Sequence, residues 1–189
     1  NLPYGDAVRS ATEDLNAYWK SLGDAYGFDF KPVDNTVRFA YDTAPPKCGS
    51  KQYTEDEAIN TIFFCVDDNY VGWDEGMLQG VGEDIGDMGI GTLLAKQWAV
   101  SAQVQSQLPK DVIESKEGVT QQSCFTGAWT RAVLEGDRHN TDESGEPRLT
   151  LSPGDIDEAV LAFLNISETP DSKGQTATGG RPPGRRGPA

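Results

Sequence analysis

The sequence predicts an α+β fold in which a small antiparallel sheet packs on a long central helix and further helices. Residues 83–107 contain no proline and place apolar side chains throughout, which predicts a long helix that ends before Pro109. Residues 61–66 and 70–73 are short apolar runs on either side of an acidic stretch, 67–69. This arrangement is typical of a β-hairpin, and together with the long helix it sets the fold class.

The remaining elements follow from their own periodicities. Residues 11–22 place apolar side chains on one helical face and Gly23 follows, which predicts an amphipathic helix that ends there. Residues 36–42 alternate polar and apolar side chains, as a half-buried strand does. A third helix is expected over 121–134. A fourth begins at the capping sequence Ser-Pro-Gly-Asp of residues 152–155.

The composition indicates one globular domain with a strong negative charge. The 189 residues are 37% hydrophobic and include 16 Lys+Arg against 30 Asp+Glu, so the formal net charge is −14. Such a surface repels phosphate groups, which disfavours nucleic acid and anionic membranes as partners. No stretch approaches the roughly 18 to 20 apolar residues of a membrane span. The chain begins at Asn1 with no signal peptide, so we expect that any targeting segment has been removed.

We expect a folded domain over residues 1–166 and a tail over 167–189. After Asn165 the sequence becomes rich in Ser, Thr, Gly, Pro and Arg and has no apolar residues at core spacing. A segment of this composition does not bury enough surface to fold alone, so the tail should be a flexible linker.

The cysteines favour a disulfide over a metal site. Cys48, Cys65 and Cys124, with the single histidine His139, are too few ligands in the wrong spacing for a Cys/His zinc site. Cys48 follows a proline pair and Cys65 ends an apolar run, which favours a loop-to-strand disulfide between them over two buried free thiols. That bond would close a loop of about 17 residues and contribute roughly 3 kcal/mol in the chain-entropy model. It would form in an oxidising compartment, so we expect an extracytoplasmic location.

Several short segments occur in an order that resembles a known family, the neutral zinc metallopeptidases of bacteria, which are common in actinobacteria. The match covers about residues 11–164 and implies a zincin-like fold with 83–107 as the active-site helix. The segments that carry the resemblance are Asp-Leu-Asn-Ala-Tyr-Trp at 14–19, Cys-Gly at 48–49, Phe-Phe-Cys at 63–65, Trp-Asp-Glu-Gly-Met-Leu at 73–78, Gly-Asp-Met at 86–88, Ser-Cys-Phe-Thr-Gly-Ala-Trp at 123–129 and Leu-Ser-Pro-Gly-Asp-Ile-Asp-Glu-Ala at 151–159.

The family's zinc motif is changed at both zinc-ligand positions and at the general-base position. Such peptidases hold zinc with two histidines one helical turn apart, and a glutamate after the first is the general base, written AHExxH. Residues 95–100 here read Ala-Lys-Gln-Trp-Ala-Val. Lys96 therefore replaces the first histidine, Gln97 the glutamate and Val100 the second histidine. A lysine cation, an amide and an aliphatic side chain neither bind zinc at neutral pH nor accept a proton.

The family's second motif, ExxxDC, is changed in the same way. Residues 119–124 read Val-Thr-Gln-Gln-Ser-Cys, so Val119 replaces the third zinc ligand and Ser123 replaces the acid that orients a histidine. Because both segments have lost their ligands together, the resemblance implies a peptidase fold with no metal site and no cofactor.

Other residues are weaker candidates for chemistry. Lys96 and Ser123 would form a metal-free Ser/Lys hydrolase if the resemblance places them together, although a lysine held by a hydrogen bond or ion pair is the favoured interpretation. His139 lies in a polar stretch typical of a solvated loop. The acidic residues at 67–69 suit a turn better than a calcium site.

We therefore expect a catalytically inactive metallopeptidase homologue that binds a protein or peptide partner outside the cytoplasm. Peptidase clefts bind extended chains by adding them to a sheet edge, and that surface can outlast the metal. Trp73, Lys96, Gln97 and Ser123 are the candidates for lining such a cleft, although Trp73 also suits a core. One alternative is an enzyme, either a zinc peptidase with non-standard ligands or a Ser/Lys hydrolase. Another is a structural domain of a membrane-anchored complex, with the old cleft filled by side chains.

Overall fold

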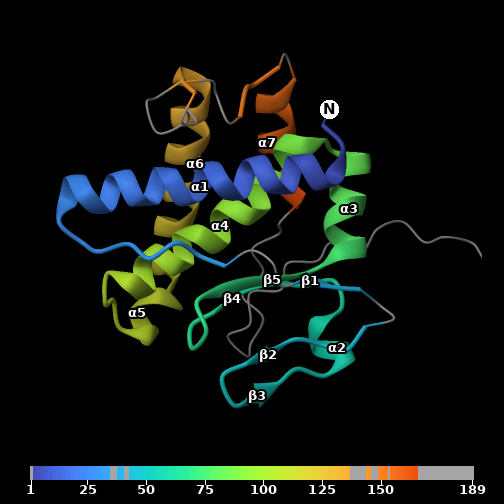
Figure 1. Cartoon of the computed structure of the whole chain (residues 1–189), viewed down its shortest axis with the longest axis vertical. Helices are drawn as coiled ribbons and strands as arrows, with labels where there is room; N and C mark the ends of the chain where they lie inside the picture. The colour runs from blue at the N-terminus through green and yellow to red at the C-terminus, as the bar shows by residue number, and fades with distance from the viewer. Residues whose placement is uncertain are drawn as a thin grey trace, which may run out of the picture.

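The computed structural model describes residues 2–34, 38–40, 43–136, 144–145, 149–152 and 154–165 (Figure 1). It is a mixed α+β fold in which helices α1, α4, α6 and α7 form one half and the strands lie in the other. The predicted tail at 167–189 lies outside the described residues. Within the described part of the chain, no helix combines the length and the apolar character needed to cross a bilayer.

The first helix is longer than its apolar pattern predicts. α1 spans Tyr4–Tyr26, against the predicted 11–22. It continues through Gly23 and ends at Gly27, which has φ 81° and donates its N–H to the Gly23 carbonyl at 2.8 Å. The left-handed conformation that ends the helix therefore occurs at the second glycine, one turn later than expected.

The predicted helix at 83–107 is wrong in its first part, because the chain breaks there into two helices. α3 spans Glu75–Asp84 and α4 spans Asp87–Gln105. Gly86 between them has φ 130° and ψ 177°, a backbone conformation essentially restricted to glycine. α4 then runs through the centre of the fold and packs against α1, α3, α6, α7 and β4.

The predicted hairpin is confirmed, and a third strand makes the sheet mixed. β4 (Ile62–Cys65) pairs antiparallel with β5 (Tyr70–Asp74), and β1 (Arg38–Phe39) lies parallel to β5 on its other side. The sheet is therefore not wholly antiparallel as expected. Of the predicted strand at 36–42, residues 36–37 and 41–42 lie outside the described part.

The expected disulfide is present. Cys48 and Cys65 are bonded with their Cα atoms 5.6 Å apart, and Cys124 is an exposed free thiol. The bond ties the edge of the sheet to a small antiparallel hairpin, β2 (Lys47–Cys48) and β3 (Lys51–Gln52), which is followed by α2 (Glu55–Ala58). Tyr53 of this segment stacks on Phe63 of β4 with ring centroids 4.5 Å apart.

The remaining helices lie near their predicted positions. α5 (Lys110–Ile113) precedes α6 (Lys116–Glu135), which begins five residues before the predicted 121 because Ser115 caps it by accepting the Gly118 N–H at 3.1 Å. α7 spans Asp155–Asn165, as the capping sequence predicts. The Ser152 hydroxyl donates to the Asp155 carboxylate at 2.7 Å, and the Ser152 N–H donates to the same carboxylate.

Three buried indoles fix the position of α1 in the core. Each donates its Nε1–H to a polar side chain, which satisfies a group whose burial would otherwise cost stability. The pairs are Trp73 with the Tyr4 hydroxyl at 3.0 Å, Trp98 with the Asn16 side-chain oxygen at 2.8 Å, and Trp129 with the Asp14 carboxylate at 2.8 Å.

Candidate functional site

The residues that replace the zinc motif lie inside the core. Lys96 and Gln97 on α4 are 5% and 6% exposed, and Val100 is half-buried. α4 is enclosed by its neighbouring helices and by β4, so this part of the helix does not line an open cleft among the described residues. Trp73, another predicted cleft residue, is 2% exposed.

The residues that replace the second motif lie on α6, which packs against α4. Val119 and Ser123 are both half-buried. The Ser123 hydroxyl donates to the Val119 carbonyl at 3.3 Å, a hydrogen bond within the helix that serines and threonines commonly make. The two motif segments are thus on neighbouring helices.

These residues do not fit a zinc ion. The set offers a lysine ammonium, an amide, two valines and a hydroxyl, whereas zinc in proteins takes imidazole, thiolate and carboxylate. Among the described residues, two groups bring together three potential ligands. One is the disulfide pair with Asp68, whose sulfurs are already bonded to each other. His139 lies outside the described residues.

A network of the buried Gln103 and Gln122 with the exposed Gln121 joins α4 to α6, and no sequence pattern predicts it. Gln103 Nε2 donates to the Gln121 side-chain oxygen at 2.7 Å and to the Gly118 carbonyl at 3.0 Å. Gln122 Nε2 donates to the Gln103 oxygen at 2.9 Å and to the Ile113 carbonyl at 3.2 Å. Because this network satisfies its amide groups internally, it stabilises the helix pair and exposes no reactive group.

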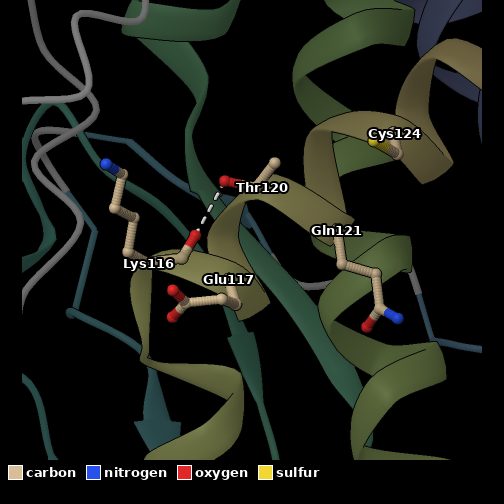
Figure 2. Close-up of a pocket in the computed structure, with 5 residues that line it drawn as sticks. All are labelled: Lys116, Glu117, Thr120, Gln121 and Cys124. Atoms are coloured by element: carbon tan, nitrogen blue, oxygen red, sulfur yellow. Dashed lines mark hydrogen bonds between the residues drawn. The ribbon is translucent and has the colours of Figure 1, made fainter.

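A pocket of about 400 Å³ lies on the outer side of α6. Figure 2 shows the five side chains that line it, all from two and a half turns of this helix. The Thr120 hydroxyl donates to the Lys116 carbonyl at 2.8 Å within the helix. The lining includes the free thiol of Cys124 but neither Lys96 nor Ser123, so this pocket is distinct from the expected cleft.

In the described part of the chain, β4 is an edge strand of its sheet with no strand on its outer side. Among the described residues β5 is its strand partner, and the Asp74 N–H donates to the Thr61 carbonyl at 2.9 Å. Backbone groups in an antiparallel pair alternate direction, so Phe63 also bonds toward β5. The N–H and C=O of Ile62 and Phe64 therefore point away from β5, toward the side on which another strand could add.

The side chains of β4 anchor this edge on both faces of the sheet. Ile62 is buried, and Phe64 is half-buried against the same helical core. Phe63 points to the opposite face, where Tyr53 and Tyr70 contact it. Since the strand is fixed on both faces, its outer backbone edge is held in an extended conformation.

The second group of potential ligands is a carboxylate cluster at the start of α4, formed by Asp87, Asp155 and Glu158. Each carboxylate accepts a hydrogen bond: Asp87 from the Leu2 N–H at 2.9 Å, Glu158 from the Met88 N–H at 3.1 Å, and Asp155 from Ser152. Burial raises the pKa of the Glu158 carboxyl; the Met88 N–H opposes this rise, and the two aspartates add to it.

The acidic turn at 67–69 has a structural role. The Asp68 carboxylate accepts the Gly49 N–H at 2.7 Å, which links the turn to the β2–β3 hairpin. Asn69 has φ 50°, as the turn requires. These contacts explain the polar residues there, in agreement with the turn interpretation.

Comparison of the chain with protein-family models, with curated proteins and with solved structures finds no match. The resemblance to zinc metallopeptidases is therefore a hypothesis that rests on the motif segments alone.

Proposed function

We propose that this chain is a catalytically inactive metallopeptidase homologue that binds an extended segment of a partner protein outside the cytoplasm. The segment adds as a further strand to the open edge of β4. The backbone groups of Ile62 and Phe64 that point away from β5 are the observation that carries this proposal.

The chemistry of the motif residues supports the absence of catalysis. Zinc hydrolysis needs neutral imidazoles to hold the ion and a carboxylate to take a proton from water. Lys96 and Gln97 supply neither, and both are buried in α4. Lys96 is 5% exposed and the Ser123 hydroxyl donates to the Val119 carbonyl of its own helix, which favours a structural role over a Ser/Lys hydrolase.

Strand addition suits β4 because the main chain supplies the affinity. A peptide that pairs with an exposed edge gains hydrogen bonds from its backbone, and pockets for alternate side chains add specificity. The disulfide at Cys65 and the stacked Tyr53 and Phe63 hold the edge strand in place before a partner binds. Less conformational entropy is then lost on binding.

The disulfide also supports the location. Disulfides persist in oxidising compartments and are rare in the cytosol of most organisms, so the Cys48–Cys65 bond favours an extracytoplasmic protein.

A second candidate, a purely structural domain of a larger complex, is favoured by one observation. Trp73, Lys96 and Gln97, which were expected to line a cleft, are buried. In that case the cleft is filled by the protein's own side chains and the contacts with other proteins lie elsewhere.

Two variants at one position separate these candidates. Phe64→Pro removes the outward N–H, and proline is tolerated where an edge-strand N–H faces solvent. Phe64→Ala loses the same aromatic packing and keeps the N–H, so it is the matched control. Peptides are first selected on the wild-type chain from a displayed random library, and their affinities for both variants are measured by isothermal titration calorimetry.

We expect the selected peptides to bind Phe64→Ala about as tightly as the wild type and Phe64→Pro about tenfold more weakly, since a net hydrogen bond contributes roughly 1 kcal/mol. Equal affinity for the two variants would refute edge addition. A library that yields no peptide above background would favour the structural domain.

A further inference from the structure

α7 turns its alanines inward and its large aliphatic side chains outward. Ala159 and Ala162 face α4 at 4% and 2% exposure. Four large aliphatic side chains face away from the core, and we call them the outer face of α7: Ile156 at 41% exposure, Val160 at 50%, Leu161 at 47% and Leu164 at 73%. A helix on a protein surface usually has the reverse arrangement, so this face has the character of a contact surface.

The spacing makes the outer face one continuous stripe. Ile156, Val160 and Leu164 are four residues apart and therefore lie on one side of the helix, with Leu161 beside them. Asp157 is the other exposed residue between Ile156 and Leu164. Helix-in-groove recognition uses anchors at this spacing.

The chain itself holds little that could cover this stripe. The residues that the structure does not describe contain only three large apolar residues, Val37, Tyr41 and Ile166. Residues 137–143 and 167–189 consist of polar, charged and small residues with proline. These residues therefore offer few apolar side chains to the stripe.

Charge indicates which kind of partner would cover the stripe. Asp157 is the exposed acid of α7, since Asp155 is buried and Glu158 is half-buried against the start of α4. α7 has no basic residue in its described side chains, and the whole chain has a net charge of −14. A second copy of this chain would bring the same acids and the same net charge. A partner with basic residues beside its apolar anchors would be attracted to this surface.

We propose that the outer face of α7 docks a basic amphipathic helix of a partner protein. Its aliphatic side would lie along the stripe from Ile156 to Leu164, and its Lys or Arg residues would face Asp157. α7 lies in the half of the molecule opposite the sheet (Figure 1), so this surface is separate from the β4 edge and does not depend on it.

The test uses the full chain and a labelled 14-residue helical peptide of leucine and lysine with one apolar face. Two control peptides are a leucine/glutamate peptide with the same apolar face and a leucine/lysine peptide of scrambled order. The protein variants are Val160→Ser with Leu164→Ser, and a matched control, Tyr26→Ser with Leu134→Ser, which replaces two exposed apolar residues on α1 and α6. Binding is followed by fluorescence anisotropy, and circular dichroism confirms that each variant is folded.

We expect the leucine/lysine peptide to bind the wild type and the control variant alike, to bind the α7 variant at least tenfold more weakly, and to lose affinity as salt is raised. No binding to the wild type, equal binding to the two variants, or equal binding of the leucine/glutamate or scrambled peptide would overturn the proposal. Sedimentation of the wild type as a dimer that the α7 variant dissociates would also overturn it, because a second copy would then occupy the face.

Discussion

Replacing Gly86 by alanine should destabilise the protein by about 2–4 kcal/mol. The residue has φ 130° and ψ 177°, and holding a residue other than glycine there costs on the order of 1–3 kcal/mol. A Cβ at this position would also overlap the carboxylate of Glu158. Moving that side chain gives up its hydrogen bond from the Met88 N–H, which contributes roughly another 1 kcal/mol.

Urea denaturation at pH 7 measures this effect. Gly80→Ala is the matched control, because Gly80 lies within α3 and a Cβ there meets nothing within 4 Å. The control should be unchanged or more stable by about 0.5–1 kcal/mol, since alanine is the better helix former.

A double-mutant cycle divides the loss into its two parts. In a Glu158→Ala background the overlap is gone, so Gly86→Ala should cost about 1 kcal/mol less than it does in the wild type. A Gly86→Ala protein within 0.5 kcal/mol of the wild type would show that the break between α3 and α4 is not fixed by this backbone conformation.

Three further changes test other parts of the fold. The raised pKa of Glu158 stabilises the folded state most below the ordinary pKa of 4.5, and this contribution is lost as pH rises through the folded-state pKa. The free energy of unfolding of Glu158→Gln, relative to that of the wild type, should therefore increase as pH rises from 4 to 8 in denaturation curves. A difference in unfolding free energy that stays the same across this range would contradict the prediction. Asn16→Ala should lose about 3 kcal/mol, because Asn16 bonds both Val33 backbone groups and the Trp98 indole; a loss below 1 kcal/mol by urea denaturation would count against that role. Replacing Cys48 and Cys65 together by alanine should cost roughly 3 kcal/mol for the 17-residue separation, and an unchanged denaturation midpoint would show that the bond adds nothing.

Local patterns were sufficient where one short segment determines the structure. The hairpin at β4 and β5 follows from two apolar runs around an acidic turn and the start of α7 from a capping sequence, and both are present. The break at Gly86 was missed because an isolated glycine is tolerated within a helical pattern. The side chain that a Cβ at Gly86 would meet belongs to Glu158, which is 72 residues away in the sequence.

Contacts between distant segments account for the rest. Alternation in residues 36–42 predicts a strand but gives neither its neighbour nor its direction, so the parallel pairing of β1 with β5 was not foreseen. The sequence likewise gives no sign that Lys96 and Gln97 are enclosed by other helices, or that the edge of β4 is open. The large outward residues of α7 could be mistaken for a core face until the structure shows the alanines against α4.

The most direct test of the central claim is the zinc content of the purified full chain, measured by elemental mass spectrometry on protein prepared without a histidine tag or chelator. An inactive homologue with Lys96, Gln97 and Val100 at the motif positions should hold far less than one zinc per chain, even after incubation with zinc and dialysis. One tightly held zinc per chain would contradict the account, because the residues at the motif positions offer no zinc ligand.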